Sequence, residues 1–390
     1  MNPVHQARRD FLKGSLGALA AAATGIHAAP DALATSAEGF QYFVTQHMMD
    51  GDGLCRSMLH QDTLKPWTKQ QLATLDQRML TDWFQNSPDY SACLAYENAL
   101  MATGEFAVSQ MARHRVTGEP AVRELARRCV HAILGVIEQG RHYMPGYLPK
   151  PFGGMAKARD SHEMSVDQYT KAIAALHAWR PLADKGERAA IDRFFVDAAD
   201  FFIARKFRHA YRHRTIVTAD THHHALGLFV PLVVLAANVS GKKEYRTHLK
   251  LFDKTIDDCA TDEKLSNFNM TSLLIDGFDL AIQEGCDDAR LPALIGSLWD
   301  RSIKNIDAAG ESFEGASPPR KTSEGTRVVA CATIVEKLHP TTRATMVASR
   351  VLHHYTEPRQ MVHYRIPGAI FDVSITSWLT AYWRLRETEA

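Results

Sequence analysis

Two kinds of helix alternate along this chain, and the alternation limits the folds that it can adopt. One kind is rich in alanine and bulky apolar residues and carries few charges, whereas the other has one heavily charged face. A helix that is apolar all round is buried, and a helix with one charged face lies at the surface. The buried kind is predicted at 90–111, 165–183, 221–237, 269–283, 325–338 and 372–386, and the surface kind at 120–139, 187–206, 243–259, 290–306 and 341–355.

The buried helices recur with a period of about 50 residues, which is typical of repeated helical hairpins. Five hairpins are complete, and the last buried helix lacks a following partner. We expect segment 68–84 to supply that partner and so to close a ring. Because alternating runs of strand type are scarce, the predicted fold is all-α, an (α/α)6 toroid with an inner ring of about six helices inside an outer ring. A linear helical solenoid is the alternative, and it would leave both of its ends exposed.

Short turns with a glycine join each of three buried helices to the charged helix that follows. We expect Gly118, Gly186 and Gly241 to end the buried helices in these turns. Pro120 follows the first turn at a first helical position, where its missing N–H costs nothing. With the short turns at one end, all buried helices run the same way and the longer loops meet at the opposite end. Long loops gathered on one face usually carry the function.

The N-terminus has the order of an export signal. Arg8-Arg9 precedes the apolar run 14–23, and Ala32-Leu33-Ala34 supplies a small-x-small cleavage site. This order predicts a twin-arginine signal over residues 1–34. The mature protein, residues 35–390, is expected to be a single toroid domain, periplasmic or secreted. No later run approaches the ~20 apolar residues of a transmembrane helix, so no integral membrane segment is expected after signal removal. A lipid-anchored or uncleaved form is the alternative.

Composition narrows the partners and cofactors. The 45 lysines and arginines against 44 aspartates and glutamates leave a net charge of +1, so no global field favours nucleic acid or an anionic membrane. The six cysteines show no C-x-x-C spacing and are expected to be buried free thiols, with one disulfide as the alternative. No cofactor is expected. Consecutive helical residues point about 100° apart, so His222, His223 and His224 cannot all bind one metal ion.

Polar side chains gather where the buried helices are predicted to begin. Capping explains part of this pattern, because Ser165 and Gln168 have the spacing of a capping box and Asp220, Asn269 and Asp372 are good N-cap residues. Six such groups meeting at one end are also what a deep polar cleft requires. The groups are Asp89 with Tyr90, Ser165 with Asp167, Asp220 with the three histidines, Asn267 with Asn269, Glu324, and Asp372 with Ser374.

The segment 159–170, RDSHEMSVDQYT, supplies the most concentrated set of candidates. His162, Glu163 and Asp167 lie at the start of a buried helix, directly followed by Gln168 and Tyr169. One imidazole of the histidine run at 222–224 is expected to turn into the same cleft. A helix N-terminus would keep that imidazole neutral and able to act as a base.

The run 205–214 is the one strongly basic stretch, and it leads towards the histidines. Tyr211, Arg212 and Arg214 are candidates for binding a carboxylate or sulfate, since arginine binds such groups through two hydrogen bonds. A solvated loop after a helix C-terminus is the alternative. Aromatic residues in the loops, Tyr90 among them, suit packing against sugar faces. The expected partner is therefore an oligo- or polysaccharide, and an anionic one.

Two short motifs resemble the six-hairpin glycosidase superfamily. They are Leu100-Met101-Ala102-Thr103-Gly104 through Thr117-Gly118-Glu119-Pro120, and Ser165-Val166-Asp167-Gln168-Tyr169. The superfamily includes unsaturated glucuronyl and rhamnogalacturonyl hydrolases and, more distantly, toroid polysaccharide lyases. The resemblance implies an α/α toroid over most of residues 60–386 and hydrolysis of a glycosidic bond with Asp167 as proton donor. It implies a second acidic residue at Asp89, or else at Glu97. Glu163 is the neighbouring carboxylate expected to favour the protonated form of Asp167.

Two other functions stay open at this point. A polysaccharide lyase of this fold would act by β-elimination, with His223, Tyr211 or Tyr169 as the base. Asn267, Asn269, Arg212 or Arg214 would then neutralise the substrate carboxylate. A non-catalytic glycan-binding protein is the third reading, because one fold hosts several functions.

Overall fold

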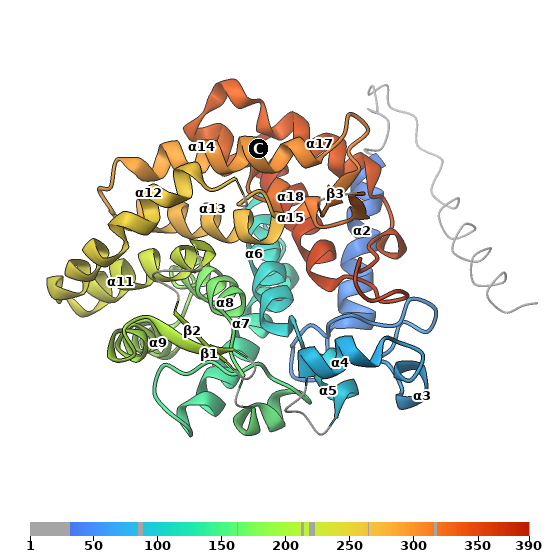
Figure 1. Ribbon diagram of the computed structural model, residues 1–390, viewed down its shortest axis with the longest axis horizontal. Helices are drawn as coiled ribbons and strands as arrows, with labels where there is room; N and C mark the ends of the chain where they lie inside the picture. Colours follow the sequence, from blue (N-terminus) through green and yellow to red (C-terminus); the bar gives the residue numbers. More distant parts are fainter. Residues whose placement is uncertain are drawn as a thin grey trace, which may run out of the picture.

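The computed structural model describes residues 32–84, 89–161, 163–211, 214–217, 223–263, 265–315 and 318–389. Within these residues six helical segments form an inner ring (Figure 1). Each segment packs on the next along the chain, and the last packs on the first. The closed ring confirms the toroid and rules out the linear solenoid. The segments are α5 (Tyr90–Leu94) with α6 (Ala99–Thr117), α8 (Val166–Trp179), α11 (Leu226–Ser240), α13 (Phe268–Gln283), α15 (Gly325–Val329) with α16 (Ala332–Leu338), and α18 (Asp372–Glu389).

An outer layer of more polar helices covers this ring, as the alternation in the sequence predicts. Each outer helix packs on the inner helices beside it in the chain. Their buried residues follow one stripe, as in α7, where Val122, Ala126, Cys129 and Val130 face inwards. The predicted outer segments appear as α7 (Pro120–Arg141), α9 (Lys185–Ala204), η4 (Lys243–Phe252) with α12 (Asp253–Thr261), α14 (Arg290–Ser302) and α17 (Ala344–His354).

The helix that completes the outer layer is α2 (Ala32–Phe43), not the expected segment 68–84. It packs on α18, where the ring of Phe40 stacks on Trp378 with centroids 4.4 Å apart. Segment 68–84 instead forms α3 (Lys69–Leu72) and α4 (Gln77–Phe84), which pack beside α5 in a small separate core. The prediction was wrong because α2 begins within the predicted export signal, residues 1–34, where no helix of the fold was expected. Most of the predicted signal, residues 1–31, lies outside the described residues, whereas Ala32 to Ala34 form the first turn of α2.

Two short hairpins that the sequence did not predict lie in the loops before inner helices. Strands β1 (Arg208–Tyr211) and β2 (Arg214–Val217) pair in antiparallel register from Arg208↔Val217 to Tyr211↔Arg214. Strands β3 (Ser312–Glu314) and β4 (Arg320–Thr322) pair from Ser312↔Thr322 to Glu314↔Arg320. The remaining single turns are η1 (Val44–Met48), η2 (Met155–Asp160), η3 (His223–Ala225), η5 (Ile303–Asn305), η6 (Pro340–Thr342) and η7 (Pro358–Gln360).

The glycine turns follow the prediction at two of three places. Gly118 and Gly241 adopt left-handed conformations, with φ of 67° and 72°, at the ends of α6 and α11. Gly186 does not end a helix, because it lies in the first turn of α9. Asp184 begins that helix by accepting from the backbone N–H of Glu187, whose side chain accepts from Asp184 N in return. A capping box therefore takes the place of the predicted glycine cap.

The core contains the cysteines and one long apolar stretch. All six cysteines are buried and free, which confirms the prediction of free thiols. Residues His223–Ser240 are long and apolar enough to cross a membrane by length and composition. However, Leu226 to Ala237 are all buried, and α11 packs on α9, α13 and η4. The apolar character of this stretch is thus that of an inner helix of the toroid.

Charged side chains from four inner helices meet inside the ring. Lys171 Nζ of α8 lies 2.5 Å from Glu105 Oε2 of α6 and 2.5 Å from Asp276 Oδ2 of α13. Arg384 of α18 approaches Asp276 Oδ1 to 3.4 Å. Burial lowers the pKa of Lys171, but the two carboxylates outweigh that effect and raise it, so the lysine is charged. Gly104 brings α6 and α8 close, since a Cβ there would lie 2.5 Å from the carbonyl oxygen of Lys171.

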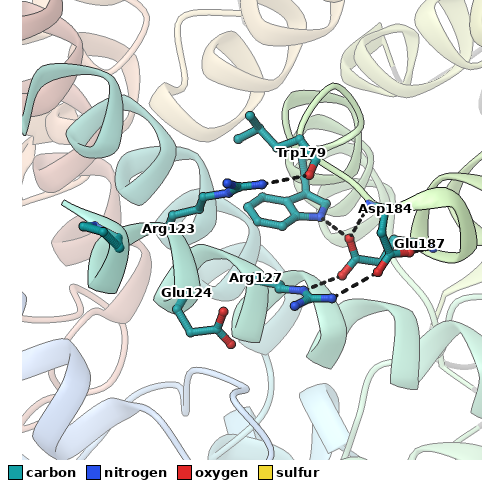
Figure 2. Close-up of a pocket in the computed structure, with 8 residues that line it drawn as sticks. Arg123, Glu124, Arg127, Trp179, Asp184 and Glu187 are labelled. Carbon is teal, nitrogen blue, oxygen red and sulfur yellow. Dashed lines mark hydrogen bonds and ion pairs between the residues drawn. The ribbon is translucent and has the colours of Figure 1, made fainter. Parts of the chain in front are cut away.

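A second charged cluster joins α7 to the turn between α8 and α9. It lines a pocket of about 370 Å³ at the C-terminal end of α8. Figure 2 shows Trp179 and Arg127 reaching the carboxylate of Glu187. Arg127 Nε donates to Oε1 over 2.6 Å and Trp179 Nε1 donates to Oε2 over 3.2 Å. His131 Nε2 lies 2.5 Å from the same carboxylate. The charged groups pair with one another, so this cluster holds α7 against the turn between α8 and α9.

Glu187→Gln should lower stability and change its dependence on acid. Burial alone raises the pKa of Glu187, but hydrogen bonds from Arg127, His131, Asp184 N and Trp179 outweigh burial and lower it to about 2. A carboxyl whose pKa falls on folding stabilises the fold above its unfolded pKa of about 4.3 and loses that contribution as the pH falls through the folded value. Urea titrations between pH 7 and pH 2 should show a loss of about 1.5–3 kcal/mol at pH 7 for the variant, the range for hydrogen bonds to a charged group. The stability of the variant should also decline less with acid than that of the wild-type protein. An equal decline in both proteins would contradict the assignment.

Candidate active site

The starts of the inner helices lie against one another on one face of the toroid, which we call the N-terminal face. Asn98, before α6, donates from Nδ2 to Asp372 Oδ1 of α18 over 3.5 Å. Gln168 of α8 donates from Nε2 to the carbonyl oxygen of Glu97 over 2.6 Å. These contacts between helix starts confirm that the inner helices run in the same direction, as the turn pattern predicts.

The β3–β4 hairpin carries one carboxylate of this face and is fixed to the start of α15. Ser312 Oγ donates to the carbonyl oxygen of Thr322 over 2.5 Å and accepts from the backbone N–H of Gly325 over 3.2 Å. A Cβ at position 325 would lie 2.6 Å from Ser312 Oγ, so the close approach requires glycine. The hairpin thereby holds Glu314 of β3 beside Glu324, the residue that precedes α15.

Glu314 and Glu324 form a coupled carboxylate pair. Glu314 Oε1 accepts from Asn267 Nδ2 over 2.9 Å and from the backbone N–H of Phe268 over 3.2 Å. Burial, and then the negative charge of Glu324, raise the pKa of Glu314 to about 7. Burial also raises the pKa of Glu324, which is fully enclosed. The positive charges of Arg327 and Arg365 act in the opposite direction. Since two close carboxylates cannot both ionise freely, the pair shares a proton near neutral pH, and Glu314 is its carrier.

Arg327 joins this pair to the start of α13. Its Nη1 lies 3.2 Å from Glu324 Oε2, and its Nη2 donates to Asn269 Oδ1. Both Arg327 and Glu324 are buried. An ion pair at this depth fixes Glu324 as the ionised member and leaves the proton on Glu314.

Arg365 is the exposed cation beside the pair. Its positive charge lowers the pKa of both Glu314 and Glu324, which places it near them. Its guanidinium lies 5.1 Å from the ring centroid of Tyr364. Within the described part of the chain it forms no ion pair, so it can accept an anionic group from solution. Neighbouring His363 is neutral, because burial first and then the charges of Arg365 and Arg327 lower its pKa to about 3.

Glu163, a predicted catalytic residue, lies in a different cluster of the N-terminal face. Lys150 Nζ lies 2.9 Å from Glu163 Oε1 and 2.6 Å from Glu97 Oε1. All three side chains are largely buried. The lysine thereby ties the loop after α7 to the starts of α6 and α8. Glu163 is thus engaged by a cation and not by Asp167.

Asp167 and Gln168 do not make the predicted capping box with Ser165. The Ser165 hydroxyl donates to Asp167 Oδ1, which also accepts from the backbone N–H of Gln168 over 2.9 Å. Gln168 is buried and bonds to the start of α6 instead of to Ser165. Asp89 caps α5 by accepting from Ser91 N and Ala92 N, and Tyr90 packs beside Phe84 in the small core.

Other predicted binding residues have structural partners. Tyr169 is 0% exposed, donates to the carbonyl oxygen of Gly146 and accepts from Leu148 N, so it belongs to the core and not to a cleft wall. Asn267 caps α13 and holds Glu314, and Asn269 accepts from Arg327. The two asparagines therefore support the carboxylate pair, which is a positioning role.

His223 is the histidine of the run whose surroundings are described. Its Nδ1 lies 2.9 Å from Asp262 Oδ2, and both side chains are partly buried. A carboxylate at Nδ1 orients an imidazole and leaves Nε2 to act as a base. The predicted His162, Arg212, Asp220 and His222 lie outside the described residues, as do the side chains of Tyr211 and Arg214.

The residues at the centre of this site were not predicted from the sequence. Glu314 lies on an unpredicted hairpin, Arg327 sits inside a helix predicted to be core, and Arg365 lies in a loop with no distinguishing pattern. Glu324 did appear among the helix-start groups but not among the candidate site residues. Its place between a long loop and a buried helix was the one available indication.

Comparisons with known proteins support the fold. No family model matches the chain, and no curated protein matches it. The structure is similar to a D-mannose isomerase, with 10% identity, 94% of this chain and 100% of that chain covered, and a TM-score of 0.52. It is similar to an unsaturated glucuronyl hydrolase from Bacillus sp. GL1, with 14% identity and a TM-score of 0.50. The alignment covers 91% of this chain and 95% of that chain. A glycosyl hydrolase family 88 protein from Bacteroides vulgatus aligns with 9% identity, 73% and 91% covered, and a TM-score of 0.48.

The fold implied by the sequence resemblance is thus confirmed, and the chain is an α/α toroid. Identities of 10–14% establish the fold alone. The chemistry has to be argued from the N-terminal face. Among the described residues no group of three histidine, cysteine, aspartate or glutamate side chains could hold a metal ion.

Proposed function

We propose that this protein is a carbohydrate-active enzyme that hydrolyses glycosidic bonds, with Glu314 as the proton donor. The observation that carries the proposal is the buried Glu314–Glu324 pair, in which the pKa of Glu314 is raised to about 7. Departure of a sugar alcohol requires a proton, and a carboxyl that is half protonated at neutral pH supplies one. Glu324, held ionised by Arg327, stabilises the positive charge that develops on the sugar ring.

The surroundings of the pair suit this division of roles. Asn267 Nδ2 and the backbone N–H of Phe268 both reach Oε1 of Glu314, which leaves Oε2 as the oxygen that carries the proton towards a substrate. When the leaving oxygen takes that proton, Glu314 becomes negative beside Arg365 and Arg327. Two guanidinium groups then offset the two carboxylates, so proton transfer makes the site electrically more balanced.

The substrate that this site suits is anionic, such as an oligo- or polysaccharide that contains uronic acid. With the proton on Glu314, the charged groups of the site are Glu324, Arg327 and Arg365, which sum to +1. Arg365 is the exposed member and the one that can pair with a sugar carboxylate. The names of the two proteins most relevant to the fold, a glucuronyl hydrolase and a mannose isomerase, also fit a sugar substrate.

Replacing Arg365 tests this substrate class. Arg365→Ala should raise KM for a uronate-containing substrate by about 10- to 100-fold, the loss expected for a charge-assisted hydrogen bond of 1.5–3 kcal/mol. The KM of the corresponding neutral sugar should change much less. The Arg359→Ala variant is a matched control, since Arg359 lies in the same loop but bonds to the carbonyl oxygen of Gln61. Equal effects of Arg365→Ala on charged and neutral substrates would exclude the carboxylate contact.

β-Elimination of a uronic-acid polysaccharide is the second candidate, and His223 with Asp262 is the observation that favours it. An imidazole held by a carboxylate is suited to abstracting the proton from the carbon that bears the sugar carboxylate, with loss of the oxygen substituent on the next carbon. A panel of uronic and neutral glycans incubated with purified protein separates the two reactions. New reducing ends with no new double bond indicate hydrolysis, new double bonds indicate elimination, and binding without products indicates a glycan-binding protein.

We also propose that the chain is exported by the twin-arginine signal at residues 1–34 and acts in the periplasm or outside the cell. The arginine pair and the small-x-small site support this proposal. Cleavage after Ala34 would remove only the first turn of α2 and leave the core residues Ala37, Phe40 and Phe43 in place. The mass of the chain recovered from an expressing cell tests the cleavage, and a full-length mass would argue against it.

A further inference from the structure

We propose that the first turns of α15 and α18 enclose a buried water-binding site through which Asp372 acts on Arg327, and so on the Glu314–Glu324 pair. Asp372 is then a positioning residue and does not touch the substrate. The inference concerns the charge state of the N-terminal face and holds whichever bond the pair cleaves.

The first observation is an unsatisfied carboxylate oxygen. Asp372 begins α18 and is 1% exposed. Its Oδ1 accepts from the backbone N–H of Met58 over 3.2 Å and from Asn98 Nδ2 over 3.5 Å. Its Oδ2 is buried and meets no hydrogen-bond donor among the described residues. A buried carboxylate oxygen without a donor is costly, so a partner from solution is expected.

Three more unsatisfied polar atoms belong to residues at the starts of α15 and α18. The side-chain atoms Ser374 Oγ, Ser323 Oγ and Arg327 Nε are buried and also lack a hydrogen-bond partner in the part of the chain that the structure describes. The two helix starts touch where Thr326 Oγ1 donates to the carbonyl oxygen of Ser374 over 3.0 Å. All four unsatisfied atoms belong to residues within one helical turn of this contact. The charge of Arg327 lowers the pKa of Asp372, which places the guanidinium near that carboxylate.

Water fits this set of atoms better than a metal ion does. Asp372 Oδ2 can only accept when ionised, Arg327 Nε can only donate, and the two serine hydroxyls can do both. A cation would be repelled by the guanidinium and would leave its N–H unsatisfied. A water molecule both donates and accepts, and buried waters typically make about three hydrogen bonds to such groups. A water between Asp372 Oδ2 and Arg327 Nε therefore satisfies both.

The consequence for the carboxylate pair follows from Arg327. This one guanidinium faces Glu324 through Nη1, Asn269 through Nη2 and the water site through Nε. Burial raises the pKa of Asp372 to about 6. Hydrogen bonds from the backbone N–H groups of Met58 and of Asp372 itself, a hydrogen bond from Asn98 and the charge of Arg327 oppose this effect. The other titratable group that faces Asp372 is the thiol of Cys55, which is fully buried and neutral. Above this pKa, Asp372 and Glu324 share one cation, and the pair holds its proton more tightly.

Two measurements on the full chain test the inference. A high-resolution crystal structure should show a water within hydrogen-bond distance of Asp372 Oδ2 and Arg327 Nε. An infrared titration of the carboxyl groups should show a transition near pH 7 that Glu314→Gln removes. In Asp372→Asn this transition should move to lower pH by about 0.5–1 pH unit, because a negative charge near Arg327 is lost. In Ser374→Ala the Asp372 transition should move to higher pH, because the ionised form loses a water contact.

Asp279→Asn is the matched control. Asp279 is a partly buried aspartate of α13 that accepts from Gln283, near the other end of the helix from Asn267. Its replacement should leave the transition of Glu314 in place. A dry space between α15 and α18, or a Glu314 transition that Asp372→Asn moves no more than Asp279→Asn does, would overturn the inference. If Asp372→Asn does not fold, Ser374→Ala still tests the inference, and an unchanged Asp372 transition in that variant would overturn it.

Discussion

Glu314→Gln is expected to lower kcat by about 100- to 10,000-fold, the usual contribution of a general acid. Glutamine has the shape of the protonated carboxyl and can still accept from Asn267 and Phe268, but it has no proton to give. For the same reason the free energy of unfolding at pH 7 should change by no more than about 1 kcal/mol. Because the wild-type reaction needs the protonated form of Glu314, its rate should fall as the pH rises above the pKa of about 7.

Two further variants decide whether the effect belongs to the pair. Glu311→Gln changes a carboxylate of the same loop that pairs with Lys321 instead, and it should keep nearly full activity. Asp167→Asn tests the proton donor that the family resemblance implies. If Asp167→Asn abolishes turnover and Glu314→Gln does not, the acid is the residue indicated by the sequence motif, and the assignment to Glu314 fails.

Lys171→Met is expected to destabilise the fold by about 3–5 kcal/mol, because it leaves Glu105 and Asp276 buried without their shared cation. Both carboxylates lie 2.5 Å from Lys171 Nζ, and only Arg384 would remain to oppose them. This loss is comparable to a large part of the stability of an ordinary domain. Chemical denaturation measures it directly, with the midpoint and the slope both recorded.

A double-variant comparison separates charge from packing in that network. Replacing a whole buried ion pair with apolar side chains is often close to neutral, whereas removing one partner is costly. Lys171→Met combined with Glu105→Leu should therefore lose less than Lys171→Met and Glu105→Leu lose in sum. Lys254→Met, which breaks an exposed pair with Asp258, should change stability by less than about 1 kcal/mol. Additive losses at positions 105 and 171 would show that the two charges do not interact.

The architecture was predictable because burial leaves a strong mark on helix composition. Residues 226–237 of α11 are buried throughout, whereas α7 buries one stripe, and this contrast is visible in the sequence as runs with and without charges. The closing helix was not predictable in the same way. In α2 the apolar residues follow directly on the predicted export signal, and contacts such as that of Phe40 with Trp378 identify them as part of the toroid.

The site was less predictable, because its chemistry depends on contacts between distant segments. Asp167, Asp89 and Asn267 stand out in the sequence as helix-start residues. In the structure Asp89 and Asn267 cap their helices, and Asp167 bonds to its neighbours Ser165 and Gln168. Glu314 acquires its raised pKa from burial and then from the charge of Glu324, and it lies on a hairpin of three-residue strands. Such short strands carry too little alternation to be recognised. The long loops and helix starts nevertheless indicated the face on which the Glu314–Glu324 pair lies.

The most direct test of the central claim is an absorbance measurement on an unsaturated uronic oligosaccharide. The wild-type protein should remove the ultraviolet absorbance of the unsaturated sugar, and Glu314→Gln at the same concentration should not. A rise in absorbance on intact uronic polysaccharide would instead support elimination by His223. Unchanged absorbance, with no products from any uronic or neutral glycan, would contradict the account of the Glu314–Glu324 pair as a site of glycosidic bond hydrolysis.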